Sequence, residues 1–370
     1  MKKILALVLV CMFALTGMAM AETVKFGVLV SDVSGEEALG FRAYYEDYIA
    51  ANYDVTFTYT DQLEDAAAEK SAIEKFAAQG YDAILSLSSS DRTTQIETAS
   101  EYGLYYAVVS GMLEDEQFEA FKGNEYFVGQ VGPSMDTEFE AGYAMGQYYA
   151  EQGVNTVGIY GAFIPNPMHV YRAAGLLAGL GCTYGGTNDK DAIVGQIFGD
   201  QGVDLSKVES DGVEIIGYLQ GFGDTTFDEV FGIISQGPDA FLSVGMATTF
   251  FADALNGAGI AYGDIDSFTS GNAANMADGT LTYLAGKYSS SVGPIFAAVL
   301  DAVNGTPIRD DEGNAISVSQ SYLVATDSET FDTIFNGDKG ENPIFSKDVL
   351  DAVIGEGVSY ADFVALVEAN

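Results

Sequence analysis

An alternation of short apolar runs and longer amphipathic stretches, which begins after Glu22, constrains this chain more than any other feature. The first series predicts strands at 24–30, 55–59, 81–87 and 104–109, with helices at 36–51, 63–78 and 93–102 between them. Strands that alternate with helices are typical of a mostly parallel sheet covered by helices on both faces. This part of the chain is therefore predicted to form one α/β lobe.

A second series of the same kind starts near residue 126. It predicts strands at 126–131, 156–160, 213–219, 240–244, 265–269 and 281–284, and helices at 135–152, 169–180, 228–235 and 249–258. After it come an amphipathic helix at 291–303, one strand at 316–324, and helices at 347–354 and 360–368. A chain of 370 residues buries enough apolar surface for two domains. The predicted fold class is α/β, with two doubly wound lobes and mostly parallel sheets.

The first 21 residues have the organisation of a secretory signal peptide. Lys2 and Lys3 precede an apolar run at 4–15, and a small-x-small cleavage site ends at Ala21. The run is shorter than the roughly 20 apolar residues of a membrane helix, and Cys11 lacks the small preceding residue of a lipidation motif. We expect cleavage after Ala21 and a periplasmic or secreted protein without membrane insertion.

The balance of charges is strongly acidic, with 54 Asp and Glu against 15 Lys and Arg and a formal net charge of −39. Such a surface repels nucleic acid and anionic lipid, so neither is an expected partner. Solubility outside the cell is one interpretation of the charge, and binding of a cationic ligand or a divalent ion is the other. Removal of the leader leaves Cys182 as the one cysteine, which excludes an intramolecular disulfide.

Several local patterns together resemble one family of two-lobed receptors. They are FGVLVSD at 26–32, GYDAIL at 80–85, EAGYAMG at 140–146, RAAGL at 172–176 and PDAFL at 238–242. Their order and spacing resemble the type I periplasmic binding proteins, the sugar-receptor family related to ribose and galactose receptors. The stretch 139–143 also resembles, more weakly, the nucleoside-binding branch of basic membrane proteins.

The resemblance implies three crossings of the chain between lobes, near 129–133, 286–290 and 320–324. Residues 22–130 and 289–318 would form the N-terminal lobe, and 131–288 with 319–370 the C-terminal lobe. Crossings of this kind allow hinge closure around a ligand held in the cleft. The implied function is that of a monomeric solute-binding protein that delivers a small molecule to an ABC permease; the alternative is a ligand-sensing module for a receptor kinase or chemoreceptor.

Candidate ligand-binding residues follow from the rule that open α/β sheets bind small molecules beyond the carboxyl ends of their strands. Both lobes present small polar residues there, interspersed with a few longer side chains. The candidates are Asp32, Ser88, Ser89, Asp91 and Ser110 in the first lobe, Asn166, His169, Phe222, Met246 and Asn272 in the second, and Lys287 and Tyr288 at the second crossing.

Each candidate also has a structural interpretation. Asp32 and Asp91 are placed to cap the helices that follow them. His169 is the one histidine, and a single histidine is as well explained by a structural role as by a ligand contact. Arg172 is expected to pair with a carboxylate or to hold the start of its helix.

Departures from the sugar-receptor pattern leave the ligand open. The chain has no Trp, and it has Ser110-Gly111, Met246 and Gly271 where the family commonly places Asp, Asn or Arg. Either the ligand is less hydroxylated, a nucleoside for example, or the sugar pocket has changed.

No catalytic motif accompanies these patterns. The chain lacks a G-x-S-x-G elbow, an H-E-x-x-H pair, a phosphate-binding loop and a G-x-G-x-x-G after its first strand. The acidic run at 310–314 lacks the spacing of an EF-hand loop. We therefore expect a binding protein without enzymatic activity, cofactor or metal.

Overall fold

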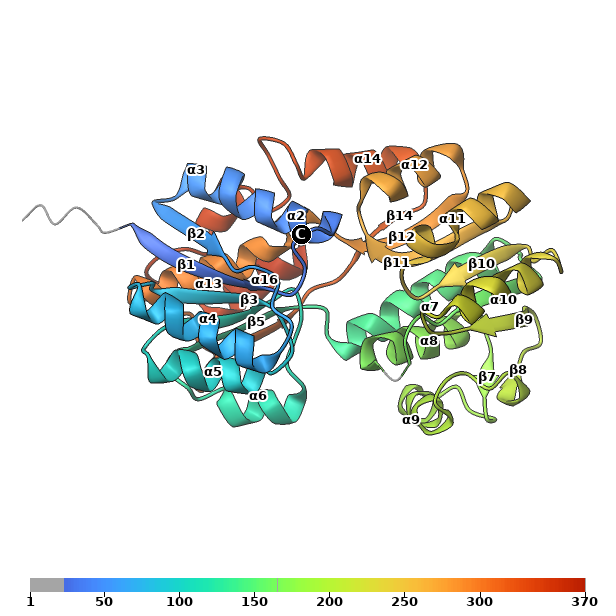
Figure 1. Ribbon diagram of the computed structural model, residues 1–370, viewed down its shortest axis with the longest axis horizontal. Helices are drawn as coiled ribbons and strands as arrows, with labels where there is room; N and C mark the ends of the chain where they lie inside the picture. The colour runs from blue at the N-terminus through green and yellow to red at the C-terminus, as the bar shows by residue number, and fades with distance from the viewer. Residues whose placement is uncertain (1–22, 165, 370) are drawn as a thin grey trace, which may run out of the picture.

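The computed structural model describes residues 23–164 and 166–369, and the predicted signal peptide lies outside this part of the chain. The described residues form two α/β lobes that lie side by side (Figure 1). Each lobe contains a six-stranded sheet with helices on both of its faces. The predicted fold class is confirmed.

The first lobe has a wholly parallel sheet in the order β13-β5-β4-β3-β1-β2. Its strands are β1 (Val24–Val30), β2 (Val55–Tyr59), β3 (Ala83–Leu87), β4 (Tyr105–Val109), β5 (Phe127–Gly132) and β13 (Ile316–Ser319). Its helical segments are α2 (Glu36–Ala43), the π-helix η1 (Tyr44–Ile49), α3 (Ala50–Asn52), α4 (Ala66–Ala78), α5 (Arg92–Glu101), α6 (Asp115–Phe121), η3 (Ser289–Val292), α13 (Gly293–Val303), α15 (Lys347–Asp351) and α16 (Tyr360–Ala369).

The second lobe has the sheet order β14-β12-β11-β10-β6-β9, in which only β14 is antiparallel to its neighbour. Its strands are β6 (Thr156–Tyr160), β9 (Glu214–Leu219), β10 (Ala240–Ser243), β11 (Ala261–Ser267), β12 (Leu281–Lys287) and β14 (Leu323–Ala325), beside a small pair of β7 (Thr183–Tyr184) and β8 (Val208–Glu209). Its helices are α7 (Met135–Glu151), α8 (Pro167–Gly179), α9 (Lys190–Asp200), η2 (Leu205–Lys207), α10 (Asp224–Ile234), α11 (Ala247–Ala258), α12 (Ser270–Asp278) and α14 (Ser328–Gly337).

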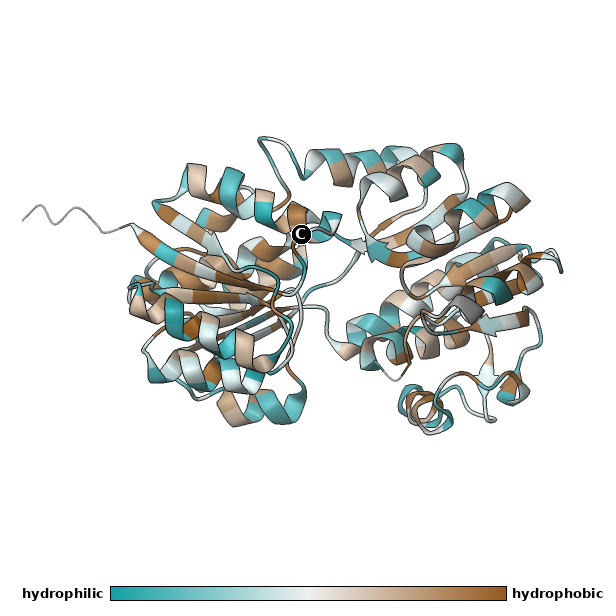
Figure 2. Ribbon diagram, in the orientation of Figure 1, coloured by the Kyte–Doolittle hydropathy of each residue, from teal (hydrophilic) through white to brown (hydrophobic). Residues whose placement is uncertain are grey.

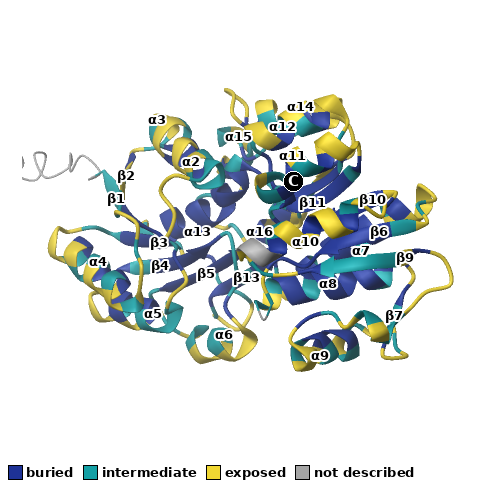
Figure 3. Cartoon of the chain, turned by 45° about the vertical axis from the view of Figure 1, so that its right-hand side comes forward, coloured by how far each residue is buried: buried dark blue, intermediate teal, exposed yellow. Residues whose placement is uncertain are grey.

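The apolar runs that predict the strands form the centre of each lobe. Strand β3 is buried over residues 83–86, and α13 is buried along all but its last residue. Strands with both faces covered bury every side chain, which explains why their sequences are continuous apolar runs without alternation. Figure 2 shows these strands in hydrophobic colours inside shells of more polar helices, and Figure 3 shows the exposed residues on the outer helices.

Helices α7 and α8 of the second lobe pack closely against each other along faces that carry glycines. Gly142 and Gly146 on α7 face Gly175 and Gly179 on α8, and a Cβ atom at any of the four would collide with the backbone of the opposite helix. Only glycine permits so close an approach. The contact brings Glu138 of α7 and Arg172 of α8 together.

The chain passes between the lobes four times within the described residues. The three expected crossings join β5 to α7, β12 to η3, and β13 to β14. A fourth follows α14, which packs on α12 and β14 of the second lobe, whereas α15 packs on α13 and α16 on β13 of the first.

Two expectations about the C-terminal third need correction. The predicted strand 316–324 is two short strands in different sheets, β13 and β14, because the chain crosses between the lobes at 320–322. The segment 319–370 was expected in the second lobe, but its last part returns to the first. Phe345 and Leu350 are fully buried there, and the hydroxyl of Tyr360 donates to the carbonyl oxygen of Ser317 at 2.9 Å.

Candidate functional site

A cleft of about 850 Å³ lies between the lobes at the carboxyl ends of their strands. The first lobe contributes the loop after β3 and the loop between β4 and α6, and the second contributes the start of α8. Among the residues that line it are Ser89, Ser90, Asp91, Arg92 and Met112 on one side, Asn166, Met168, Tyr171 and Phe198 on the other, and Gln130, Ser134 and Ser317 beside the crossings. A cleft of this size suits a small molecule.

Three of the predicted ligand-binding residues line this cleft, namely Ser89, Asp91 and Asn166. Two of them also cap helices. The carboxylate of Asp91 accepts from the backbone N–H of Thr94 at 3.0 Å, and Asn166 accepts from that of Met168 at 3.1 Å. Capping and a position in the cleft therefore coincide, because helices that start at strand ends point their first turns between the lobes.

Four other predicted residues are buried inside the lobes. Ser88 is fully buried and donates to Glu69 at 2.5 Å, and Asn272 donates to the carbonyl oxygen of Ser267 at 2.7 Å. Tyr288 is buried, with its ring stacked on that of Phe345 at 6.3 Å between centroids. These side chains hold the loops around the cleft instead of lining it.

His169 is the fourth of these buried residues. Its Nδ1 atom lies 2.9 Å from the backbone nitrogen of Phe163, which donates to it, so the ring holds the loop between β6 and α8. Burial and the nearby charge of Arg172 lower the pKa of His169 to about 4. The structural interpretation of this histidine agrees with its position.

Asp32, Met246 and Phe222 lie outside the cleft lining. Asp32 is exposed and accepts from the backbone N–H groups of Ser34 and Gly35 at 2.9 and 3.0 Å, which lowers its pKa. Met246 has a left-handed backbone, with φ of 70°, before α11. Phe222 is 43% exposed.

Lys287 and Ser110 form a contact between the lobes. The ammonium group of Lys287, at the end of β12, donates to the backbone oxygen of Ser110, at the end of β4, over 3.4 Å. Both were predicted to contact ligand, and the structure places them together across the junction.

Arg92 is the main cleft residue that the sequence analysis missed. One terminal nitrogen, Nη1, donates to the carbonyl oxygen of Met112 at 2.8 Å, while Nε is buried without a partner. The other terminal nitrogen, Nη2, lies 3.2 Å from the position that a Cβ of Gly111 would occupy. Nε and Nη2 form the edge of a guanidinium that binds two oxygens at once. Its sequence signal was the basic residue directly after a capping Asp at a strand end.

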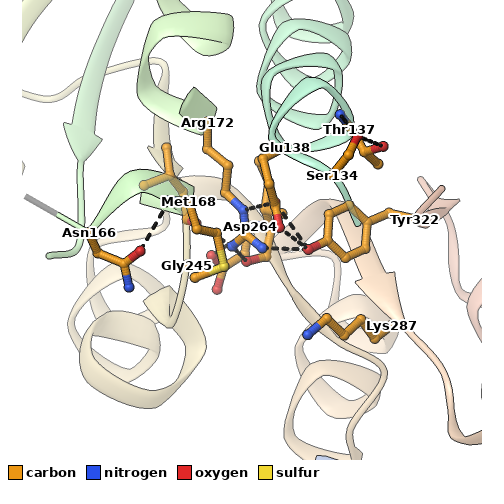
Figure 4. Close-up of polar contacts among 12 residues, drawn as sticks. Ser134, Thr137, Glu138, Asn166, Met168, Arg172, Gly245, Asp264, Lys287 and Tyr322 are labelled. Atoms are coloured by element: carbon orange, nitrogen blue, oxygen red, sulfur yellow. Dashed lines mark hydrogen bonds and ion pairs between the residues drawn. The ribbon is translucent and has the colours of Figure 1, made fainter. Parts of the chain in front are cut away.

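A buried polar network joins the second lobe to the third crossing (Figure 4). Arg172 Nε donates to Glu138 at 2.6 Å, and Nη2 donates to the hydroxyl of Tyr322 at 2.7 Å. The Tyr322 hydroxyl also lies 2.9 Å from the Glu138 carboxylate. Burial opposes the charge of Arg172, but Glu138 and Tyr322 outweigh it and raise its pKa. The predicted pairing of Arg172 with a carboxylate is confirmed.

Buried carboxylates lie beside this network on β11. Asp264 is fully buried and accepts from the backbone N–H of Thr248 at 3.3 Å. Burial, with the neighbouring Asp266 as a second cause, holds its pKa well above the ordinary range. Burial and the charge of Glu37, on α2 of the first lobe, raise the pKa of Asp266 in turn.

Comparisons with known proteins agree with this architecture. No family model matches the sequence, and no curated protein is detectably similar to it. A periplasmic solute-binding protein of an ABC transporter from Actinobacillus succinogenes, with bound D-allose, has a TM-score of 0.60 at 13% identity, over 84% of this chain and 99% of its own. This chain has the periplasmic binding protein fold.

Other proteins with the same fold carry related ligands. The arabinose ABC transporter component from a Shewanella species, bound to L-arabinofuranose, has a TM-score of 0.56 at 16% identity, over 85% of this chain and 95% of its own. A solute-binding protein from Bacillus halodurans with bound myo-inositol has a TM-score of 0.55 at 17% identity, over 85% and 98%. The resemblance to periplasmic binding proteins is thus confirmed for the fold.

The described residues contain neither a membrane-spanning helix nor a cluster of metal-binding side chains. No helix there is both long and apolar enough to cross a membrane. Over the same residues, no group of three or more His, Cys, Asp and Glu side chains is arranged to hold a metal ion.

Proposed function

We propose that this protein is an exported, monomeric solute-binding protein that captures a small molecule between its lobes and delivers it to an ABC permease, without catalysis. The observation that carries the proposal is the cleft of about 850 Å³, whose walls come from both lobes. A site built from two lobes and a hinge allows binding to change the relative position of the lobes. The three similar solved structures hold sugars or a cyclic polyol.

The lining of the cleft favours a cyclic solute with several oxygens and at least one apolar face. Asp91 and Asn166 provide acceptors and donors on opposite walls, and Arg92 provides a charged donor. Met112 and Met168 border the same space and suit the C–H face of a ring, because methionine adapts to irregular apolar surfaces. Sugars, cyclic polyols and nucleosides share this combination.

Capture in this mechanism proceeds by a shift between lobe arrangements. The solute contacts one wall first, and the second wall then approaches. Ligand can move this equilibrium only by its difference in affinity for the two arrangements. The contact between Lys287 and Ser110 and the bonds of Glu36 on α2 to Ser270 on α12 are junction contacts that such movement would rearrange.

A thermal-shift screen of the chain from Glu22 onward tests the proposal, with neutral sugars, sugar acids, cyclic polyols, nucleosides, amino acids and polyamines. A ligand that binds only the folded state raises the melting temperature. We expect one cyclic polyoxygenated class to do so, and small-angle scattering to show compaction with that solute. A shift with polyamines or amino acids alone would contradict the proposed ligand class, and a bound solute without compaction would contradict the closure mechanism.

A further inference from the structure

Helix α14 bridges the two lobes and is not simply packed on one of them. It begins in contact with the second lobe, where Phe331 is 1% exposed and its ring lies 5.0 Å from that of Phe268. Its cap at Asp327, which accepts from the backbone N–H of Thr330 at 2.8 Å, fixes this first turn. The first half of the helix is therefore anchored on α12, β14 and the residue that follows β11.

The end of the same helix is anchored on the first lobe. The carboxylate of Asp338 is 3% exposed and accepts from the backbone N–H of Ser290 at 2.7 Å and from the Ser290 hydroxyl. It also accepts from the backbone N–H of Ile344 at 3.1 Å, and this bond holds the end of the loop after α14 against Asp338. Ser290 belongs to η3, which leads into the central helix α13 of the first lobe.

The chain beyond the helix strengthens this second anchor. Phe345 is fully buried, and its carbonyl oxygen accepts from the Tyr44 hydroxyl at 2.6 Å. Tyr53 then donates to the carboxylate of Asp351 at 2.9 Å. The C-terminal segment is thus held on the first lobe by Tyr44 of η1 and by Tyr53, directly after α3, as well as by η3.

A helix between two anchors behaves differently from a flexible crossing. The seven residue steps from Phe331 to Asp338 span about 10 Å at 1.5 Å per step, and a helix cannot stretch as an irregular linker does. The other three crossings are short extended segments, whose backbone torsions can absorb rotation. Movement of the lobes must therefore pivot on the helix or break one of its anchors.

We infer that residues 328–338 form a strut that limits the relative motion of the lobes and holds them in a narrow range of arrangements before solute binds. The inference deepens the proposed function, since closure on a solute is the motion that the strut restrains. The range of motion is a property of the solute-free protein and can be measured without any ligand.

The test measures the distance between spin labels on the two lobes. Lys70→Cys on α4 and Glu229→Cys on α10 place labels at exposed positions, and Cys182 is buried and stays unlabelled. A protease site inserted between the exposed Gly340 and Glu341 is cut after folding, so that the covalent link behind the strut is broken in a folded molecule. Asp338→Ala removes the carboxylate that anchors the helix on Ser290. The cut Asp338→Ala chain lacks both this anchor and the covalent link behind the helix.

We expect the width of the solute-free distance distribution to at least double in the cut Asp338→Ala chain, with smaller increases for the cut alone and for Asp338→Asn. The matched control carries the same site in the exposed turn at Gly186, within the second lobe, and is expected to keep the parental distribution after cutting. An unchanged distribution in the doubly altered chain, or equal broadening in the control, would overturn the strut. If Asp338→Ala does not fold, the cut Asp338→Asn chain replaces it, and an unchanged distribution in that chain would overturn the strut.

The outcome is independent of the proposed function. A chain that binds no solute in the screen can still show the broadening, which would retain the strut and remove the solute-binding proposal. A chain that binds and compacts around a solute, with no broadening after the cut, would retain the proposed function and remove the strut.

Discussion

Arg172 of the second lobe and Arg92 of the first lobe differ in how many hydrogen-bond partners each has within the protein. Arg172 of the second lobe has a carboxylate, a tyrosine hydroxyl and two carbonyl oxygens as partners, the latter from Val244 and Ile265 at 2.8 and 3.1 Å. Arg92 of the first lobe donates to one carbonyl oxygen, and its buried Nε has no hydrogen-bond partner among the described residues. Burial accordingly lowers the pKa of Arg92, whereas the pKa of Arg172 is raised.

This difference distinguishes an arginine that stabilises the fold from one that we propose contacts the solute. A buried charge is stable only when it is paired and its hydrogen bonds are satisfied, and Arg172 meets that condition within the protein. Arg92 lines the cleft and has fewer partners within the protein, which is why we propose that it contacts the solute. A complete set of partners therefore indicates that Arg172 stabilises the fold, and the proposed role of Arg92 rests on its position in the cleft.

Removal of the paired arginine tests the first half of the comparison and has the largest expected effect. Arg172→Ala leaves Glu138 buried without its partner, which costs about 3–5 kcal/mol of unfolding free energy. Denaturant unfolding measures the loss. Arg42→Ala is the matched control, because Arg42 pairs with Glu46 on an exposed helix face, where a pair contributes about 0–1 kcal/mol. Equal small losses for both variants would mean that the buried network does not hold the second lobe.

Most of the fold could be predicted because its strands are buried on both faces and so appear as continuous apolar runs. Strands β1, β2 and β6 have the predicted bounds. The errors concern the lobe to which a segment belongs. The run 316–324 has the residues of one strand, and only its pairing with two different sheets divides it at 320–322. The amphipathic pattern of 347–354 predicts a helix but does not indicate which lobe covers its apolar face.

The candidate site was harder to predict, because adjacent side chains at the end of one strand can point into the core or into the cleft. Ser88 and Ser89 are adjacent in the same loop, yet Ser88 is bound to Glu69 inside the lobe while Ser89 is exposed at the cleft. A side-chain direction of this kind depends on the path of the loop, which local sequence does not encode. Arg92 was missed for a related reason, since its position at the start of α5 suggests only a helix boundary.

The pH dependence of stability sharpens the description of the second lobe. Because burial raises the pKa of Asp264, the folded state retains a proton that the unfolded state releases above about pH 4. Stability from this group is full below that pH and is lost as the pH rises toward the raised value, by up to about 1.4 kcal/mol per pH unit.

Asp264→Asn tests this sign, since it keeps a neutral side chain of the same shape at every pH. We expect the variant to gain stability relative to the parent between pH 5 and pH 8, measured by denaturant unfolding at several pH values. Asp253→Asn, at an exposed position on α11, is expected to follow the parent at each pH. If the unfolding free energy of the variant instead fell relative to that of the parent as the pH rises, Asp264 would be ionised in the folded protein.

The smallest effect on stability, and the sharpest test of the comparison, belongs to the unpaired arginine. Arg92→Met removes a desolvated charge that has no carboxylate partner, so we expect the unfolding free energy to change by less than about 1 kcal/mol. The affinity for the solute found in the screen should fall by about 10- to 100-fold, which corresponds to hydrogen bonds from a charged donor of about 1.5–3 kcal/mol. Titration calorimetry measures it, with Arg92→Lys as the control that keeps the charge but loses the fork. Two results together would contradict the comparison: unchanged affinity of Arg92→Met for the solute, and a loss of stability as large as that of Arg172→Ala. Both arginines would then have the same structural role.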